Sequence, residues 1–115
     1  MELSLTTREI AGHQVVHVRG EVDVYTSSVL RERLIELIDG GARSVVVDLS
    51  RVDFLDSSGL GVLVGALKRL RTTEGDLSLV VASDKLLKIF KITALDRVFA
   101  LHDTVEAATR VPRTE

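Results

Sequence analysis

Residues 44–72 read SVVVDLSRVDFLDSSGLGVLVGALKRLRT, and this stretch sets the framework of the fold. The apolar run within residues 44–49 is typical of a central strand that is buried on both faces. From Ser57 to about residue 73, apolar residues recur at helical spacing, which predicts an amphipathic helix. We expect residues 53–56 to form the loop between this strand and this helix. The predicted core stripe of the helix consists of Leu60, Leu63, Val64, Leu67 and Leu70.

The sequence on either side extends this strand and helix into an alternating pattern. Residues 3–10 and 14–19 have the composition of two short strands, and the AGH tripeptide between them predicts an antiparallel hairpin. Gly20 is expected to end the second strand. Because helices then separate the successive strands, we predict an α/β fold: a mixed β-sheet with an N-terminal antiparallel hairpin, followed by alternating helices and parallel strands, with the helices packed on the sheet. The other predicted elements are a helix from Thr26 or Ser27 to Gly40, a strand over 77–82, a helix over 85–91, a strand over 98–101, and a helix from Asp103 or Thr104 that Pro112 ends.

Length and composition fit one globular domain. The chain has 115 residues, of which 45% are hydrophobic and 28% are charged. These values are ordinary for a single folded domain, so we assign residues 1–115 to one domain. We expect residues 110–115 to be a frayed tail. A monomer is the default expectation.

Charge and residue usage argue against several classes of function. The formal net charge is −2, and basic residues are scattered among acidic ones, so no basic face fits a nucleic-acid backbone. The absence of cysteine excludes disulfides and thiolate metal sites. No apolar run approaches the roughly 20 residues of a membrane helix. We therefore expect a cytoplasmic protein with no nucleic-acid or membrane partner, no metal and no cofactor.

The DSSG tetrapeptide at residues 56–59 is the most informative loop of the chain. It opens an apolar helix, so we expect Ser57 or Ser58 to occupy the N-cap. One interpretation is an ordinary cap, in which the hydroxyl accepts a bond from a helix amide and contributes about 1 kcal/mol. The other is a phosphorylation site, because free amides and the helix dipole tolerate an added phosphate.

Two glycines inside the same helix raise a second question. Gly61 and Gly65 share a helical stripe with Ser57, and each costs about 1 kcal/mol of helix stability relative to alanine. They would allow either close packing of the helix on its neighbours or a smooth outer surface that a partner can approach. Their alignment with Ser57 favours the partner surface.

Three motifs, in chain order, resemble those of one family. They are GEVD at residues 20–23, VVVDL at 45–49 and FLDSSGLGV at 54–62. With these motifs the chain resembles a bacterial anti-sigma factor antagonist, also called an anti-anti-sigma factor, of the stand-alone STAS domain family. The resemblance extends over about residues 3–108. It implies a STAS-like fold and a regulatory protein that is not an enzyme.

The resemblance also implies a cycle of partner switching. The unphosphorylated antagonist binds an anti-sigma factor, which is itself an ATP-dependent serine kinase, and the sigma factor is released. The kinase phosphorylates the first serine after the aspartate, here Ser57, and the phosphorylated form dissociates until a metal-dependent serine phosphatase restores it. Asp23 matches an acidic residue of the same docking surface. We expect Asp56, Ser58 and Gly59 to shape the loop, and these residues with Gly61 and Gly65 to contact the partner.

Three other classes of protein compete with this interpretation. A hydrolase would need a histidine placed beside a serine, and no motif places His13, His17 or His102 in that way. A phosphoaspartate receiver would use Asp48 with an acidic pair after the first strand, which the sequence lacks; Asp48 is expected to be a strand-end loop residue. A non-switching STAS scaffold in a stress-signalling assembly remains open, because the sequence does not separate it from a switching antagonist.

Overall fold

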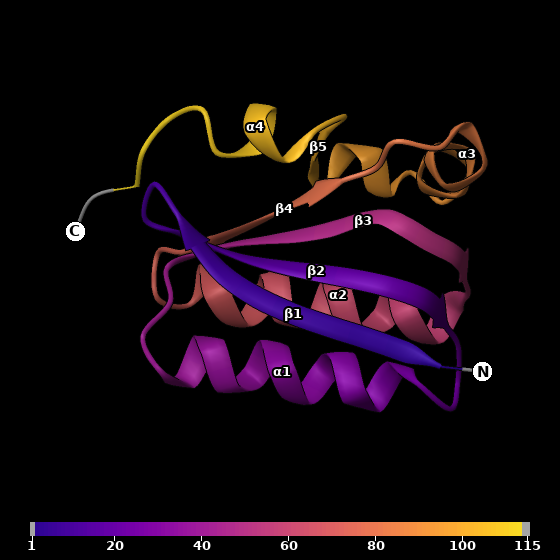
Figure 1. The fold of residues 1–115 in the computed structure, drawn as a ribbon, viewed down its shortest axis with the longest axis horizontal. Helices are drawn as coiled ribbons and strands as arrows, with labels where there is room; N and C mark the ends of the chain where they lie inside the picture. The colour runs from indigo at the N-terminus through magenta and orange to yellow at the C-terminus, as the bar shows by residue number, and fades with distance from the viewer. Residues whose placement is uncertain (1, 114–115) are drawn as a thin grey trace.

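The computed structural model describes residues 2–113. Its five strands form one sheet in the order β1-β2-β3-β4-β5 (Figure 1). Strands β1 and β2 are antiparallel, and β2 through β5 are parallel. The predicted mixed α/β fold is therefore confirmed. The elements are β1 (Leu3–Ile10), β2 (His13–Val22), α1 (Ser27–Asp39), β3 (Ser44–Leu55), α2 (Ser57–Arg71), β4 (Asp76–Val80), α3 (Asp84–Ile92), a 3₁₀ helix η1 (Leu95–Arg97), β5 (Ala100–His102) and α4 (Val105–Ala108).

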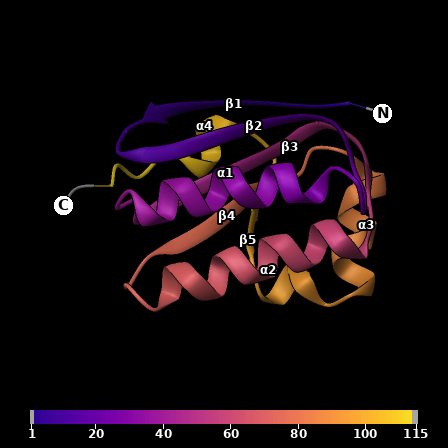
Figure 2. The same cartoon turned by 90° about the horizontal axis from the view of Figure 1, so that it is seen from below.

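Helices α1 and α2 lie side by side on one face of the sheet, and α4 lies on the other (Figures 1 and 2). The main core is the layer between the sheet and these two helices, where Leu34, Leu63 and Val47 are fully buried. The predicted stripe of α2 is buried in this layer, apart from Val64, which is half-buried. A smaller cluster of three valines on the opposite face is covered by α4. Burial of β3 on both faces matches the expectation from its apolar run.

The hairpin turn consists of Ala11 and Gly12, so His13 is the first residue of β2 and not part of the turn. Both turn residues have positive φ angles, 53° and 84°, as a type I′ hairpin turn requires. A Cβ on Gly12 would lie 1.9 Å from the carbonyl oxygen of Arg113. Only glycine therefore fits between the hairpin and the C-terminal segment.

The C-terminal segment is bonded to this hairpin up to Arg113, in contrast to the frayed tail expected over residues 110–115. The carbonyl of Val111 lies 2.7 Å from His13 Nε2, and the Arg113 amide donates to Ala11 O at 2.7 Å. These bonds join segments about a hundred residues apart, so no local pattern predicts them. Residues 114–115 lie outside the described range.

Two strands are longer than expected. Gly20 does not end β2; it lies within the strand with φ of 114°, at an irregularity in the pairing with β3. A Cβ there would lie 2.2 Å from Glu2 O, so the glycine allows a close approach inside the strand. Residues 53–55, expected in a loop, continue β3, because Phe54 pairs with Glu21 and Leu55 pairs with Val22. Parallel pairing thus extends both strands to the edge where α2 begins.

The last strand and the last helix differ from their predicted ranges. Helix α4 ends at Ala108, four residues before Pro112. It ends where the Thr109 hydroxyl bonds to the Val105 carbonyl, so proline is not the stop signal. Strand β5 begins at Ala100 because η1, which the sequence did not predict, precedes it.

Candidate functional site

The start of α2 is capped by Asp56 and not by Ser57 or Ser58, which corrects the sequence expectation. Its Oδ1 accepts hydrogen bonds from the amides of Ser58 at 3.0 Å and Gly59 at 3.3 Å. The Asp56 backbone is extended, with φ of −108° and ψ of −172°, as an N-cap requires. One carboxylate therefore accepts both amides, and Ser57 becomes the first residue of the helix.

The two serines that follow Asp56 differ in their environments. The hydroxyl of Ser58 donates to Asp56 Oδ1, and its side chain is half-buried. Ser57 is exposed, and within residues 2–113 its hydroxyl has no hydrogen-bond partner. The hydroxyl of Ser57 is thus the one that an approaching molecule can reach.

Asp56 keeps a negative charge beside this hydroxyl. The hydrogen bond from the Ser58 hydroxyl is the main cause that lowers the pKa of Asp56. Desolvation, the next largest effect, opposes it, and the amides of Gly59 and Ser58 lower the pKa further. The carboxylate is therefore ionised at neutral pH and interacts favourably with the helix dipole. A phosphate on Ser57 would therefore be a second negative charge beside the Asp56 carboxylate.

The three glycines of α2 have different roles. A Cβ on Gly59 would lie 2.6 Å from Leu55 Cδ1 and 2.7 Å from Val22 Cγ1, so Gly59 packs the helix against the ends of β2 and β3. A Cβ on Gly61 or Gly65 would meet no atom within 4 Å. Close packing thus explains Gly59 alone. Gly61 and Gly65 lie on an open surface, and their role in partner binding stays a prediction.

This open surface forms the floor of a shallow groove between α1 and α2, two helices that lie next to each other in Figure 2. The groove has a volume of about 310 Å³. Ser58 lies among its lining residues, so the groove begins at the same helix terminus as Ser57. Both polar and apolar side chains line the groove, among them Arg31, Ile35 and Val62.

Asp23 holds the turn between β2 and α1. It is only 5% exposed, and its Oδ1 accepts from the amides of Tyr25 at 2.9 Å and Thr26 at 3.0 Å. Thr26 occupies the N-cap of α1, as expected, but its hydroxyl donates to the Glu21 carbonyl and does not cap the helix. This turn adjoins the Ser57 segment, because the Asp56 amide donates to Val22 O at 3.2 Å.

A polar network on the other face of the sheet was not predicted. Asp48 lies inside β3, not in a loop, and its Oδ2 is 2.7 Å from His17 Nδ1. Burial raises the pKa of Asp48, but hydrogen bonds from Ser50 and His17 outweigh it and lower the pKa overall. Arg8 Nε donates to His17 Nε2 at 3.0 Å, so this ring nitrogen faces a cation and no serine. The network pairs strands and has no triad geometry.

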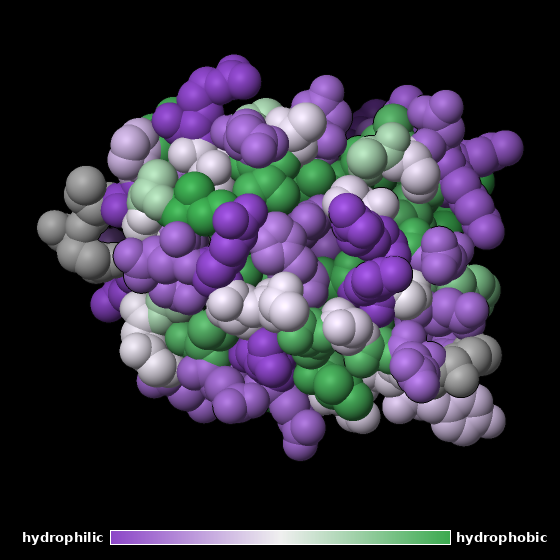
Figure 3. Space-filling view, viewed as in Figure 1, coloured by the Kyte–Doolittle hydropathy of each residue, from purple (hydrophilic) through white to green (hydrophobic). Residues whose placement is uncertain are grey.

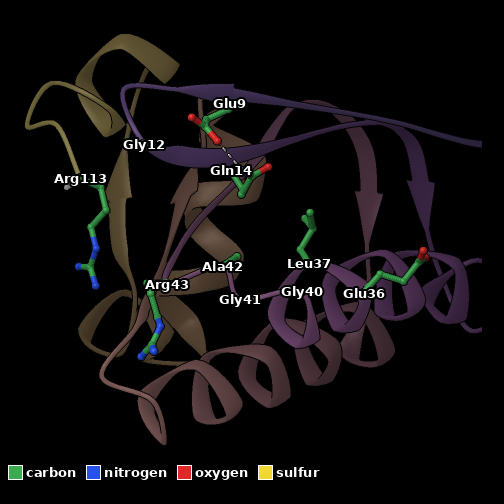
Figure 4. A pocket seen from close by; sticks show the side chains of 10 residues that line it. All are labelled: Glu9, Gly12, Gln14, Glu36, Leu37, Gly40, Gly41, Ala42, Arg43 and Arg113. Carbon is green, nitrogen blue, oxygen red and sulfur yellow. Dashed lines mark hydrogen bonds between the residues drawn. The ribbon is translucent and has the colours of Figure 1, made fainter. Parts of the chain in front are cut away.

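A second cavity lies at the opposite end of α1, between its C-terminus and the hairpin (Figure 4). Its volume is about 630 Å³, and a hydrogen bond of 3.1 Å joins Gln14 to Glu9 on its wall. Arg43 and Arg113 also contribute side chains. None of the sequence-predicted site residues lines it.

Within residues 2–113, no group of three or more His, Asp or Glu side chains is arranged to hold a metal ion. In the same range, none of the helices is both long and apolar enough to cross a membrane.

The fold and the site define a class of small α/β domain, one that displays a free serine hydroxyl at a helix start where two parallel strands end. The chain belongs to the STAS domain family, whose model matches residues 4–108.

Named relatives agree with this assignment. The chain is 37% identical over 95 residues to the anti-sigma-B factor antagonist of Bacillus subtilis, covering 83% of this chain and 86% of the relative. It is 35% identical over 106 residues to the protein of the same name from Staphylococcus aureus, covering 92% and 98%.

Solved structures show the same fold. An anti-sigma factor antagonist from Mycobacterium paratuberculosis superposes with a TM-score of 0.89 and 28% identity, covering 95% of this chain and 92% of that one. The phosphorylated form of the Bacillus protein SpoIIAA superposes with a TM-score of 0.72 and 24% identity, covering 93% and 98%. At that identity the second likeness concerns the fold alone.

Proposed function

We propose that this chain is an anti-sigma factor antagonist that is switched off by phosphorylation of Ser57. The observation that carries the proposal is the contrast between the two serines: Ser57 is exposed at the first helical position, whereas the Ser58 hydroxyl is bonded to Asp56. The names of the relatives supply the class of target, an anti-sigma factor.

In this proposal the unphosphorylated chain binds an anti-sigma factor that is also a serine kinase, and the sigma factor is released. The kinase transfers the γ-phosphoryl group of ATP to Ser57 Oγ. A P–O bond to serine forms as the P–O bond to ADP breaks, and the hydroxyl proton passes to a base of the kinase. A separate serine phosphatase reverses the modification. The antagonist acts as a monomer in the cytoplasm and contributes no catalytic group.

Electrostatics explains why the modification would end the complex. A phosphoserine carries about −1.5 to −2 charges at pH 7 and would lie beside Asp56, which is already ionised. Asp56 also occupies the amides of Ser58 and Gly59, so those two donors are not available to the phosphate. A partner surface that fits a neutral hydroxyl would meet like charge and lose solvation. No rearrangement inside the antagonist is required.

The contact surface in this proposal follows α2 from its start. It comprises Ser57, the loop residues Asp56, Ser58 and Gly59, and the open glycines Gly61 and Gly65, with Asp23 supporting the adjacent turn.

A displacement experiment tests the proposed activity. The unphosphorylated chain is titrated into a preformed complex of a sigma factor and an anti-sigma factor from the same genome, and free sigma factor is measured by size-exclusion chromatography. We expect release of sigma with wild type and none with Gly61→Leu, since a large side chain on the open stripe would block the partner without disturbing the core. Gly61→Leu must retain the unfolding midpoint of wild type. Sigma that stays bound at saturating wild-type chain, for every anti-sigma factor of that genome, would refute the proposal.

A further inference from the structure

Four exposed large apolar residues belong to the segments at the edge where β2 and β3 end and α1 and α2 begin. Tyr25 is 85% exposed, Val24 66%, Val29 46% and Phe54 43%. Both strand ends and both helix starts lie at the right-hand end of the molecule in Figure 1. On the broad side seen in Figure 3, polar residues are interspersed among apolar ones. Single exposed apolar residues are ordinary, but several at one edge mark an interaction surface.

This apolar edge is continuous with the Ser57 segment. Val22, the last residue of β2, accepts a hydrogen bond from the Asp56 amide at 3.2 Å and would touch a Cβ on Gly59. Tyr25 follows three residues later, and Phe54 precedes Asp56 by two. Tyr25 and Phe54 thus each stand within three residues, along the chain, of the hydrogen bond that joins the end of β2 to the Ser57 segment.

Asp23 fixes the turn that displays Tyr25. Its Oδ1 holds the Tyr25 amide at 2.9 Å and the Thr26 amide at 3.0 Å, and the Thr26 hydroxyl donates to Glu21 O at 2.7 Å. The aromatic ring is thus presented on a backbone that is already ordered. Pre-ordering reduces the entropy lost on binding, and a tyrosine ring buries a large area with few rotatable bonds.

Charges around the apolar edge indicate what kind of surface would cover it. Glu21 pairs with Phe54 across the strands, Asp53 precedes Phe54 in the chain and Asp56 follows it, and Asp56 is ionised at neutral pH. Lys85 Nζ donates to the Asp53 carbonyl at 3.4 Å, so one cation is bonded to this strand end. A complementary partner would offer an apolar pocket with basic residues around it.

We propose that Tyr25 and Phe54 are the apolar anchors by which the anti-sigma factor recognises this chain, and that Asp23 is a positioning residue for Tyr25. The occupant of this edge is the kinase of the proposed function, on which this inference rests. It contacts the edge through an apolar pocket with a basic rim while its active site holds Ser57. Buried aromatic side chains of this kind carry much of the free energy of binding in many interfaces.

The anchors are tested with the anti-sigma factor that releases sigma in the displacement experiment. We expect Tyr25→Ser and Phe54→Ser each to lower affinity by about 10- to 100-fold in calorimetry, as anchor truncations do. The KM for phosphorylation of Ser57 should rise by a similar factor, with kcat within about threefold of wild type, because the hydroxyl and its cap are unchanged. Val111→Ser is the matched control, since Val111 is 76% exposed and lies in the C-terminal segment. Its affinity should equal that of wild type.

A conservative variant tests whether Asp23 acts by positioning Tyr25. Asp23→Asn keeps an oxygen that can accept the Tyr25 and Thr26 amides, so it should restore most of the affinity that Asp23→Ala loses. Each variant must show the unfolding midpoint of wild type before its affinity is interpreted. Asp23→Asn that binds as weakly as Asp23→Ala, both being folded, would refute the positioning role.

The outcomes distinguish this inference from the proposed function. If Tyr25→Ser and Phe54→Ser both bind within twofold of wild type while Ser57→Asp binds weakly, the anchors are wrong and the phosphorylation switch stands. If Ser57→Asp binds as tightly as wild type, the switch itself fails.

Discussion

Ser57→Asp is expected to bind the anti-sigma factor at least 100-fold more weakly than Ser57→Ala. The introduced carboxylate would lie beside Asp56, whose lowered pKa keeps it ionised, in a contact that fits a neutral hydroxyl. A 100-fold loss corresponds to about 2.7 kcal/mol, within the several kcal/mol that juxtaposed like charges cost at an interface. Ser57→Ala should bind at least as tightly as wild type and cannot be switched off. Calorimetry with the same anti-sigma factor measures both.

Thr104→Asp is the matched control for this experiment. Thr104 is also exposed at a helix start, where it caps α4 on the other face of the sheet. The substitution adds the same charge and retains a good N-cap residue. Its affinity should equal that of wild type, which would show that position and not net charge determines the loss. Equal affinities for Ser57→Asp and Ser57→Ala would contradict the electrostatic explanation.

Gly59→Val is expected to destabilise the fold by about 2–3 kcal/mol, as overpacking of a tight site does. The new Cβ alone would lie 2.6 Å from Leu55 and 2.7 Å from Val22, and both contacts must open. Gly61→Val introduces the same side chain two residues along α2, where a Cβ meets nothing within 4 Å. We expect it to change the free energy of unfolding by less than about 1 kcal/mol, since valine is no worse than glycine in a helix.

Urea unfolding of both variants under the same conditions gives the comparison. A Gly61→Val variant as unstable as Gly59→Val would place Gly61 in a packed interface and remove the open stripe from the account. A fully stable Gly59→Val would show that the helix can shift away from the strand ends.

The parts of the fold that were predictable from sequence rest on local patterns. The period of apolar residues in α2 and the unbroken valine run in β3 both reflect which faces meet the core, and those faces are buried. The hairpin turn around Gly12 is also set by neighbours in the chain, although His13, which was expected in the turn, begins β2. Patterns of this kind depend on a few adjacent residues, so the sequence alone carries them.

The parts that were not predictable depend on contacts distant in the chain. Gly20 was expected to stop β2, but Glu2 approaches it from the neighbouring strand and the ladder with β3 continues past it. The pairing of His17 with Asp48 spans 31 residues, and the bond between His13 and Val111 spans 98. Only the assembled sheet brings these groups together.

The candidate site was predictable in position but not in detail. The DSSG loop was expected to begin α2, and it does so. The cap is Asp56 and not Ser57 or Ser58, because the Asp56 carboxylate accepts the amides of Ser58 and Gly59. Asp23 was placed on the docking surface by resemblance. The structure places its carboxylate inside the turn, where it supports the exposed ring of Tyr25. Asp23 can thus contribute to the site by ordering the backbone of the turn.

Mapping the phosphate is the most direct test of the central claim. The chain is incubated with the anti-sigma kinase of the same genome and ATP, and intact-mass and peptide mass spectrometry locate the modification. The account predicts one phosphate on Ser57, present in Ser58→Ala and absent in Ser57→Ala. A stable complex without any phosphate would instead favour a non-switching STAS scaffold, and a phosphate on Ser58 or another residue would contradict the assignment of Ser57 as the switch.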